Sequence, residues 1–279
     1  MEKLILKELE KKACQVRLHI IEGTFNAGCG HPGGSLSAAD VITYLYFNEM
    51  RVFPSNEKSE NRDRFVLSKG HAAPALYGAL ALKGFISEEE IKSLRKVGSV
   101  LQGHPNLNTP GVDMSTGSLG QGVSAAVGMA LAGKLDKKDY RVYALLGDGE
   151  IEEGEVWEAA MFASAKKLDN LVVIVDNNNL QIDGTVEEVN SPYPIDEKFK
   201  AFGFEVINID GHDFEQMETA FAKARSVKGK PTAIVMKTVK GKGVSFMEDV
   251  CSWHGRTPGA EEYITAIGEL RLCLAELEA

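Results

Sequence analysis

Two polar side chains follow two apolar segments of the sequence and could together bind a divalent cation. Asp148 lies in a Gly-Asp-Gly sequence directly after the apolar run Val142–Leu146, and Asn178 follows the run Leu171–Val175 closely. One helical pattern separates the two runs, which predicts a right-handed βαβ unit with parallel strands. Since the carboxyl ends of neighbouring parallel strands lie on one edge of a sheet, we expect Asp148 and Asn178 to lie close together.

The chemistry expected at this edge is that of a cation bound together with a phosphate group. A carboxylate, an amide oxygen and a main-chain carbonyl form a weak set of oxygen ligands, which Mg²⁺ commonly completes with phosphate oxygens and water. Gly147 and Gly149 leave the main chain beside Asp148 open to a diphosphate. A Gly-Asp-Gly sequence taken alone is better explained as a strand-end turn. The pairing with Asn178 on the next strand favours the binding site.

Short apolar runs rich in β-branched residues predict the strands that position this site. They are Arg64–Leu67, Val142–Leu146, Leu171–Val175, Glu205–Ile209 and Ala233–Met236. Such continuous runs are typical of strands buried on both faces of a parallel sheet. Helical patterns are found at Ala13–Ala27, Ala38–Glu49, Pro74–Lys83, Gly122–Leu135, Gly154–Lys167, Asp213–Val227 and Ala260–Glu278. The alternation predicts one α/β domain over residues 1–279, a doubly wound and mostly parallel sheet flanked by helices.

Composition excludes several classes of protein. The chain is 44% hydrophobic and 25% charged, as is usual for a globular protein, which excludes disordered and collagen-like chains. The net charge of −9 would repel phosphate backbones, so we expect no general binding of nucleic acid. The 28 glycines exceed the usual share of about 7%, which indicates main chain held close to a ligand.

Nothing in the sequence indicates export or a membrane. The segment Met1–Lys12 reads as an amphipathic helix and lacks the apolar core of a signal peptide. The longest uncharged stretch, Met114–Gly133, contains five glycines and is too polar to cross a bilayer, so we expect a buried loop and helix. The four cysteines show no paired spacing, which favours free thiols in an intracellular protein. We therefore expect the cytoplasm.

Four other patterns have less specific explanations. Gly28–Gly33 matches G-x-G-x-x-G, but the segment before it is helical and Pro32 lies where a helix should be entered, so we reject a dinucleotide site. Lys240–Gly243 lacks the spacing of a phosphate-binding P-loop. The six histidines show no close pair with metal-ligand spacing. The glutamates of Glu150–Glu158 are explained by the dipole at the start of a helix.

Taken together, the motifs resemble those of a known family. Gly147–Gly149 followed by Asn177-Asn178 resembles the thiamine diphosphate signature, which opens with Gly-Asp-Gly and closes with Asn-Asn. Five further segments resemble transketolase, in transketolase order: Gly30–Gly34, Ser68–Ala72, Gly103–Pro105, Thr116–Gly122 and His254-Gly255. Cys29 stands where Ser or Asn is more familiar, and we expect this departure to affect local packing only. The resemblance implies the thiamine diphosphate-binding fold.

The resemblance also implies a role for each matching residue. Asp148 and Asn178 would hold Mg²⁺, or Ca²⁺ or Mn²⁺, with their side chains, and Leu180 would hold it with its carbonyl. The cofactor would be contacted by residues on several loops: His71, Gly117, Leu119, Gly149, Asn178, Ile182 and His254. The catalytic residues would be His31, His104, His254 and Glu153. A neutral imidazole exchanges protons near neutral pH, although each histidine taken singly is better explained as structural.

The resemblance further implies a partner. In the family, the glutamate that activates the cofactor lies in a second, pyrimidine-binding domain, which is followed by a C-terminal domain. This chain ends at Ala279, so we expect the N-terminal subunit of a split transketolase that requires a separate C-terminal subunit, in a heterotetramer with two of each. Glu153 resembles a residue that reaches that glutamate from the other chain. The expected reaction moves a two-carbon ketol unit from a ketose phosphate to an aldose phosphate in pentose phosphate metabolism.

Two alternatives stay open at the level of sequence. One is a subunit of another thiamine diphosphate enzyme, such as deoxyxylulose phosphate synthase or a 2-oxoacid dehydrogenase. The segments Gly30–Gly33 and Ser68–His71 favour transketolase over both. The other is a non-catalytic cofactor-binding protein on the same fold. Retention of Asp148, Asn178 and the histidines argues against it.

Overall fold

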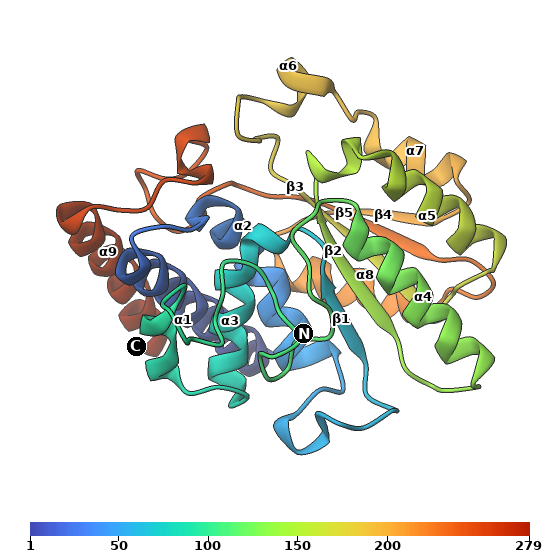
Figure 1. Ribbon diagram of the computed structural model, residues 1–279, viewed down its shortest axis with the longest axis horizontal. Coiled ribbons are helices and arrows are strands. Elements are labelled where there is room, and N and C mark those ends of the chain that lie inside the picture. Colours follow the sequence, from blue (N-terminus) through green and yellow to red (C-terminus); the bar gives the residue numbers. More distant parts are fainter.

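The computed structural model describes residues 1–279 and contains a five-stranded parallel sheet (Figure 1). Its strands are β1 (Arg64–Leu67), β2 (Val142–Gly147), β3 (Leu171–Asn177), β4 (Glu205–Asp210) and β5 (Thr232–Lys237). They lie in the order β1-β2-β3-β5-β4, and every neighbouring pair is parallel. The predicted α/β fold with a parallel sheet is confirmed, and each strand occupies its predicted run.

Nine α-helices surround the sheet. They are α1 (Lys3–Ala27), α2 (Pro32–Tyr44), α3 (Ala73–Lys83), α4 (Gln121–Leu135), α5 (Gly154–Ala165), α6 (Val186–Asn190), α7 (Ile195–Ala201), α8 (Phe214–Ser226) and α9 (Ala260–Glu278). Figure 1 shows α1, α3 and α9 on one side of the sheet and α4, α5 and α7 on the other. The sheet is therefore covered on both faces, as its continuous apolar strands require.

The strands divide their side chains between two apolar cores. Tyr143 and Leu145 of β2 point into a core of 48 buried residues that includes side chains of α1, α2, α3, α8 and α9. Ala144 and Leu146 of the same strand point into a core of 23 buried residues with α4, α5 and α7. Because successive side chains of a strand point to opposite faces, one six-residue strand serves both cores.

Several helix boundaries differ from the sequence-based expectation. The amphipathic segment Met1–Lys12 and the pattern Ala13–Ala27 form one continuous helix, α1, because no residue between them breaks it. Helix α2 begins at Pro32, six residues before its expected start. The expectation that Pro32 opposes helix entry was wrong, because proline is well tolerated in the first turn, where its missing N–H leaves no bond unmade. The rejection of a dinucleotide motif stands, since α1 and not a strand precedes it.

The segment between β3 and β4 contains two short helices, α6 and α7, that the sequence analysis did not predict. The start of α6 is a capping box: Thr185 Oγ1 accepts from Glu188 N at 3.2 Å, and Thr185 N donates to the Glu188 carboxylate at 3.3 Å. A Thr-x-x-Glu pattern in a sequence predicts the start of a helix, so this helix could have been predicted. The N-cap of α8 is Asp213, the first residue of the predicted helical pattern, and its Oδ1 accepts from Glu215 N and Gln216 N.

No helix of the structure is both long enough and apolar enough to cross a membrane. The uncharged stretch Met114–Gly133 is a loop followed by most of α4. The expectation that it is buried holds for only one side of that helix, because Gln121, Gly128 and Ala132 are exposed. The four cysteines are free thiols.

Candidate functional site

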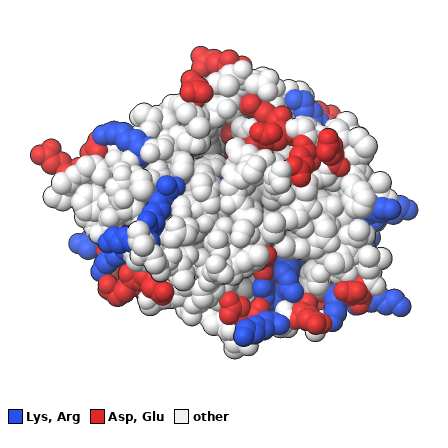
Figure 2. Space-filling model, viewed as in Figure 1, with Lys and Arg blue, Asp and Glu red and all other residues white.

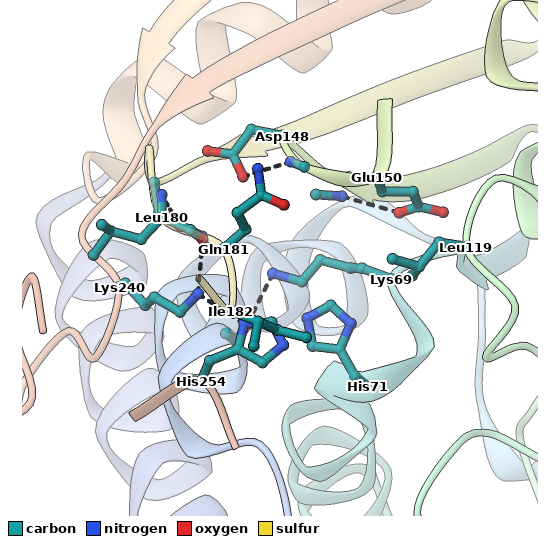
Figure 3. Close-up of a pocket in the computed structure, with 14 residues that line it drawn as sticks. Lys69, His71, Leu119, Asp148, Glu150, Leu180, Gln181, Ile182, Lys240 and His254 are labelled. Atoms are coloured by element: carbon teal, nitrogen blue, oxygen red, sulfur yellow. Dashed lines mark hydrogen bonds between the residues drawn. The ribbon is translucent and has the colours of Figure 1, made fainter. Parts of the chain in front are cut away.

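A pocket opens at the carboxyl ends of β2 and β3, and Figure 3 shows the side chains that line it. It contains eight of the predicted site residues: His71, Leu119, Asp148, Gly149, Asn178, Leu180, Ile182 and His254. In the sheet, Gly147 pairs with Asp176, which brings the segments after both strands side by side. The predicted meeting of Asp148 and Asn178 at one edge is confirmed, because β2 and β3 are direct neighbours.

The oxygen atoms of three predicted metal ligands lie at this pocket. The Asp148 carboxylate is buried and accepts from two main-chain donors, Gly149 N at 2.9 Å and Asn179 N. Asn178 Oδ1 accepts from Leu180 N at 3.1 Å. The Leu180 carbonyl accepts from a lysine, Lys240 Nζ, at 2.7 Å. Carboxylate, amide and carbonyl oxygens form the kind of donor set that Mg²⁺ accepts.

The electrostatics of Asp148 fit a site for a cation. Burial and the neighbouring Asp176 carboxylate raise the pKa of Asp148 to about 6. Asp176 has its own cationic partner, because Lys69 Nζ lies 2.5 Å from its Oδ2 and both side chains are fully buried. No cationic side chain forms an ion pair with Asp148. A divalent cation would offset the cost of burying this carboxylate.

Two buried lysines, Lys69 and Lys240, line the pocket and were missed as site residues. Lys240 is 2% exposed, and its ammonium contacts both Leu180 O and His254 Nδ1, the latter at 2.9 Å. Burial and the positive charge of Lys69 lower the pKa of Lys240 to about 8. The Lys-Gly-Lys-Gly sequence at Lys240 is not a P-loop, as its spacing indicates, yet it does place a cation beside the strand ends.

Four of the six histidines cluster around the pocket. The ring centroid of His31 lies 5.4 Å from that of His71, 6.1 Å from His104 and 5.5 Å from His254. His71 and His254 stack at 5.1 Å. Burial and nearby cations lower the pKa of His31 to about 4 and that of His254 to about 3, and burial also lowers the pKa of His71 and His104. All four imidazoles are therefore neutral near pH 7.

Four predicted site residues lie outside the pocket lining: His31, His104, Gly117 and Glu153. His31 lies beside two residues of the lining, His71 and His254, and His104 lies beside His31. Gly117 packs against His104, since a Cβ at Gly117 would lie 3.1 Å from His104 Cδ2. Glu153 is exposed and precedes α5, where a Cβ on Gly120 would lie 2.9 Å from Glu153 Cβ. The fold of this chain therefore does not bring Glu153 into the histidine cluster.

Glu150 corrects the helix-dipole explanation of the acidic cluster. Its side chain is buried, and its carboxylate accepts from Gly120 N and Gly147 N, each at 3.0 Å, and from the Ser68 hydroxyl. Gly147 ends β2, Ser68 directly follows β1 and Gly120 directly precedes α4, so Glu150 ties the loop that carries Leu119 to the ends of two strands. The dipole at the start of α5 is left to Glu155. No local pattern in the sequence signals the contacts with Ser68 and Gly120, which lie 82 and 30 positions away.

Comparison with known proteins identifies the family of this chain. The chain matches the family model for the transketolase thiamine diphosphate binding domain over residues 10–270. It is 45% identical to one subunit of the apulose-4-phosphate transketolase of Phocaeicola vulgatus, over 98% of this chain and 97% of that protein. It is also 45% identical to a 6-deoxy-6-sulfo-D-fructose transketolase subunit of a Clostridium species, over 94% of this chain and 96% of that protein.

Comparison with solved structures also identifies transketolases. The solved transketolase from Leishmania mexicana superimposes with a TM-score of 0.87 and 30% sequence identity. The alignment covers 97% of this chain and 45% of that one, so this chain spans about half of the solved transketolase. Fold and site define an α/β protein with a polar pocket at the carboxyl ends of its parallel strands. The chain belongs to the transketolase family and comprises its thiamine diphosphate-binding domain.

Proposed function

We propose that this chain is the diphosphate-binding subunit of a two-chain transketolase. The reaction transfers a two-carbon ketol unit from a ketose phosphate to an aldose phosphate, in pentose phosphate metabolism. The observation that carries the proposal is the single pocket that unites the oxygens of Asp148, Asn178 and Leu180 with the cation of Lys240. Residues 1–279 form one domain that acts in the cytoplasm, and the pyrimidine-binding and C-terminal domains belong to a partner chain.

The residues present fit a diphosphate bound through a divalent cation. Asp148, Asn178 and the Leu180 carbonyl would hold Mg²⁺, or Ca²⁺ or Mn²⁺, because the buried Asp148 carboxylate has no cationic side-chain partner. The anionic cofactor would be met by Lys240, a buried cation in the same pocket. The remaining contacts to thiamine diphosphate would come from His71, Gly117, Leu119, Gly149, Asn178, Ile182 and His254.

When bound, thiamine diphosphate supplies the nucleophilic carbon that carries the two-carbon unit. The chain's own histidines handle the protons of the sugars. As the C2–C3 bond of the donor ketose breaks, its C3 hydroxyl loses a proton, and the acceptor's aldehyde oxygen gains one when the new carbon–carbon bond forms. His31, His104 and His254 are neutral near pH 7. An unprotonated ring nitrogen of His31 or His104 can accept that proton and return it, whereas His254, whose Nδ1 accepts from Lys240, would donate from Nε2 to a sugar oxygen.

A partner subunit completes this site. Two relatives that match along nearly their whole length are named as subunits of transketolases. Figure 2 shows that charged side chains lie mainly around the rim of this view and that its centre lacks Lys, Arg, Asp and Glu. Depletion of charge is typical of the core of a protein–protein interface. We infer a heterotetramer with two copies of each subunit, in which the exposed Glu153 contacts the partner.

The test is reconstitution. The chain is co-expressed with a candidate C-terminal subunit, and transfer from xylulose 5-phosphate to ribose 5-phosphate is measured with thiamine diphosphate and Mg²⁺. We expect activity only with both subunits, and sedimentation of the complex as a heterotetramer. Absence of transfer in every pairing, with cofactor and metal present, would contradict the proposal.

A second candidate function is the same ketol transfer with a different donor sugar. The relatives with 45% identity are named for apulose-4-phosphate and for 6-deoxy-6-sulfo-D-fructose, so either compound could replace the pentose phosphate as donor. The same assay with these two donors separates the candidates. A higher kcat/KM for one of them would assign the chain to that sugar and leave the ketol transfer unchanged.

A further inference from the structure

A chain of buried polar contacts lies outside the pocket. Arg17 of α1 and Asp40 of α2 form a two-armed ion pair, with Nη1 to Oδ1 at 2.9 Å and Nη2 to Oδ2 at 2.6 Å. His212, which lies between β4 and α8, extends it, because its Nδ1 lies 2.6 Å from Asp40 Oδ2. Arg17 and Asp40 are 8% and 5% exposed. Three side chains from separate elements thus form one connected network.

Both ends of this network hold the main chain that carries Lys240. The N–H of Val239 donates to His212 Nε2 at 2.9 Å, and Arg17 Nε donates to the Lys242 carbonyl at 3.0 Å. Because Nε2 accepts, the ring proton must be on Nδ1, where it is donated to Asp40. The network therefore fixes the main chain at Val239 and Lys242, on either side of Lys240, by one accepted and one donated hydrogen bond.

Lys240 needs such support because its position is costly. Its ammonium is removed from water and points at Leu180 O and His254 Nδ1, and no carboxylate forms an ion pair with it. A lysine on a free loop would turn toward solvent, since its long side chain loses rotamer freedom and hydration when it is buried. The main chain at Val239 and Lys242 must be held for the side chain to stay in the pocket.

We propose that Arg17, Asp40 and His212 are positioning residues for Lys240 and thereby set the affinity of the pocket for a diphosphate. None of the three lines that pocket, so each acts through the main chain beside Lys240. This inference rests on the proposed function for its ligand, although the positioning itself does not depend on it. Supporting residues behind a ligating group typically change ligand affinity by about 10- to 100-fold.

The decisive variant is His212→Leu, which removes both hydrogen bonds of the imidazole. His212→Gln keeps one donor and one acceptor and serves as the conservative rescue. His19→Leu is the matched control, because His19 is a buried histidine that also meets a carboxylate, Glu88 at 3.1 Å, and contacts nothing near Lys240. Circular dichroism and urea unfolding establish that each variant is folded.

The first measurement is binding of thiamine diphosphate in Mg²⁺ by calorimetry on the full chain. We expect His212→Leu to weaken binding by about 10- to 100-fold, with His212→Gln and His19→Leu close to the unsubstituted chain. In the background of Lys240→Met, His212→Leu should cause no further loss, since its effect passes through that lysine. Equal losses in both backgrounds would overturn the proposal and assign the network to stability alone.

The second measurement is amide hydrogen exchange and needs no cofactor. His212→Leu should speed exchange in residues 239–249 at least tenfold and leave β2 and β3 unchanged. If that segment exchanges as before, the positioning role is wrong. If exchange rises but neither this chain nor its complex with a partner binds thiamine diphosphate, the positioning holds and the proposed function fails.

Discussion

Lys240 and Leu180, which are 60 positions apart in the sequence, are joined by a hydrogen bond of 2.7 Å from the ammonium to the main-chain carbonyl. The Leu180 carbonyl is also the predicted third oxygen ligand of the divalent cation. A metal ion held there would share this atom with the lysine, and both are positive charges that a diphosphate would neutralise. This relationship makes Lys240 the most informative residue that motif analysis did not assign to the site.

Replacing Lys240 should therefore weaken binding of the cofactor without harming the fold. A hydrogen bond to a charged group contributes about 1.5–3 kcal/mol, so Lys240→Met should raise the Kd for thiamine diphosphate in Mg²⁺ on the order of 10- to 100-fold. Lys242→Met is the matched control, because Lys242 lies on the same loop, is half-exposed and pairs with Glu248 at 3.4 Å. Calorimetry compares the two, and a similar loss in both would contradict a specific role for Lys240.

Asp148→Asn should change binding and stability in opposite directions. The amide cannot replace a carboxylate as the ligand of a divalent cation, so binding of Mg²⁺ with thiamine diphosphate should be lost. The free energy of unfolding without cofactor should rise, because a buried charge that burial and Asp176 disfavour is removed. Calorimetry and urea unfolding at pH 7 measure the two effects. A variant that is less stable and still binds the cofactor would refute the metal assignment.

Two glycines of the same helix, α4, should respond oppositely to alanine. A Cβ at Gly122 would lie 2.7 Å from the Cα of Ser68, so Gly122→Ala should destabilise the chain by about 1–3 kcal/mol through overpacking. At Gly128 a Cβ meets no atom within 4 Å, and Gly128→Ala should stabilise by about 0.5–1 kcal/mol through helix propensity. Urea midpoints measured side by side test this, and shifts of the same sign would contradict it.

The buried histidines should make stability fall in mild acid. The pKa of His31 is lowered to about 4 and that of His254 to about 3, mainly by burial, against about 6.5 in an unfolded chain. Between about pH 4 and 6.5 the unfolded chain therefore binds protons that the folded chain does not. Stability from this source is complete above about pH 6.5 and is lost as the pH falls through that window.

Urea unfolding at a series of pH values from neutral to mildly acidic measures this dependence. His31→Asn and His254→Gln should each flatten the slope of unfolding free energy against pH, because neither amide titrates. An unchanged slope in both variants would show that these imidazoles are already protonated in the folded chain at mildly acid pH.

Local patterns in the sequence determined the strands and the meeting of Asp148 and Asn178 at one edge of the sheet. Runs such as Val142–Leu146 are apolar and β-branched over their whole length, so they identify buried strands without further information. The order strand, helix, strand then requires Asp148 and Asn178 to leave the sheet at one edge. Motif resemblance added the histidines, because each lies beside a glycine in a recognisable segment.

Tertiary structure alone decided which further residues lie beside the predicted site residues, namely the cation of Lys240 and the buried carboxylate of Glu150. Strand β5 pairs with β3, and not only with the preceding strand β4; a linear list of strands does not reveal that pairing. It is this pairing that carries Lys240 back beside Leu180. Glu150 likewise accepts from Ser68 and Gly120, which lie 82 and 30 positions away in the sequence. Local periodicity reports on burial and direction, whereas contacts between distant segments depend on the order in which strands pack.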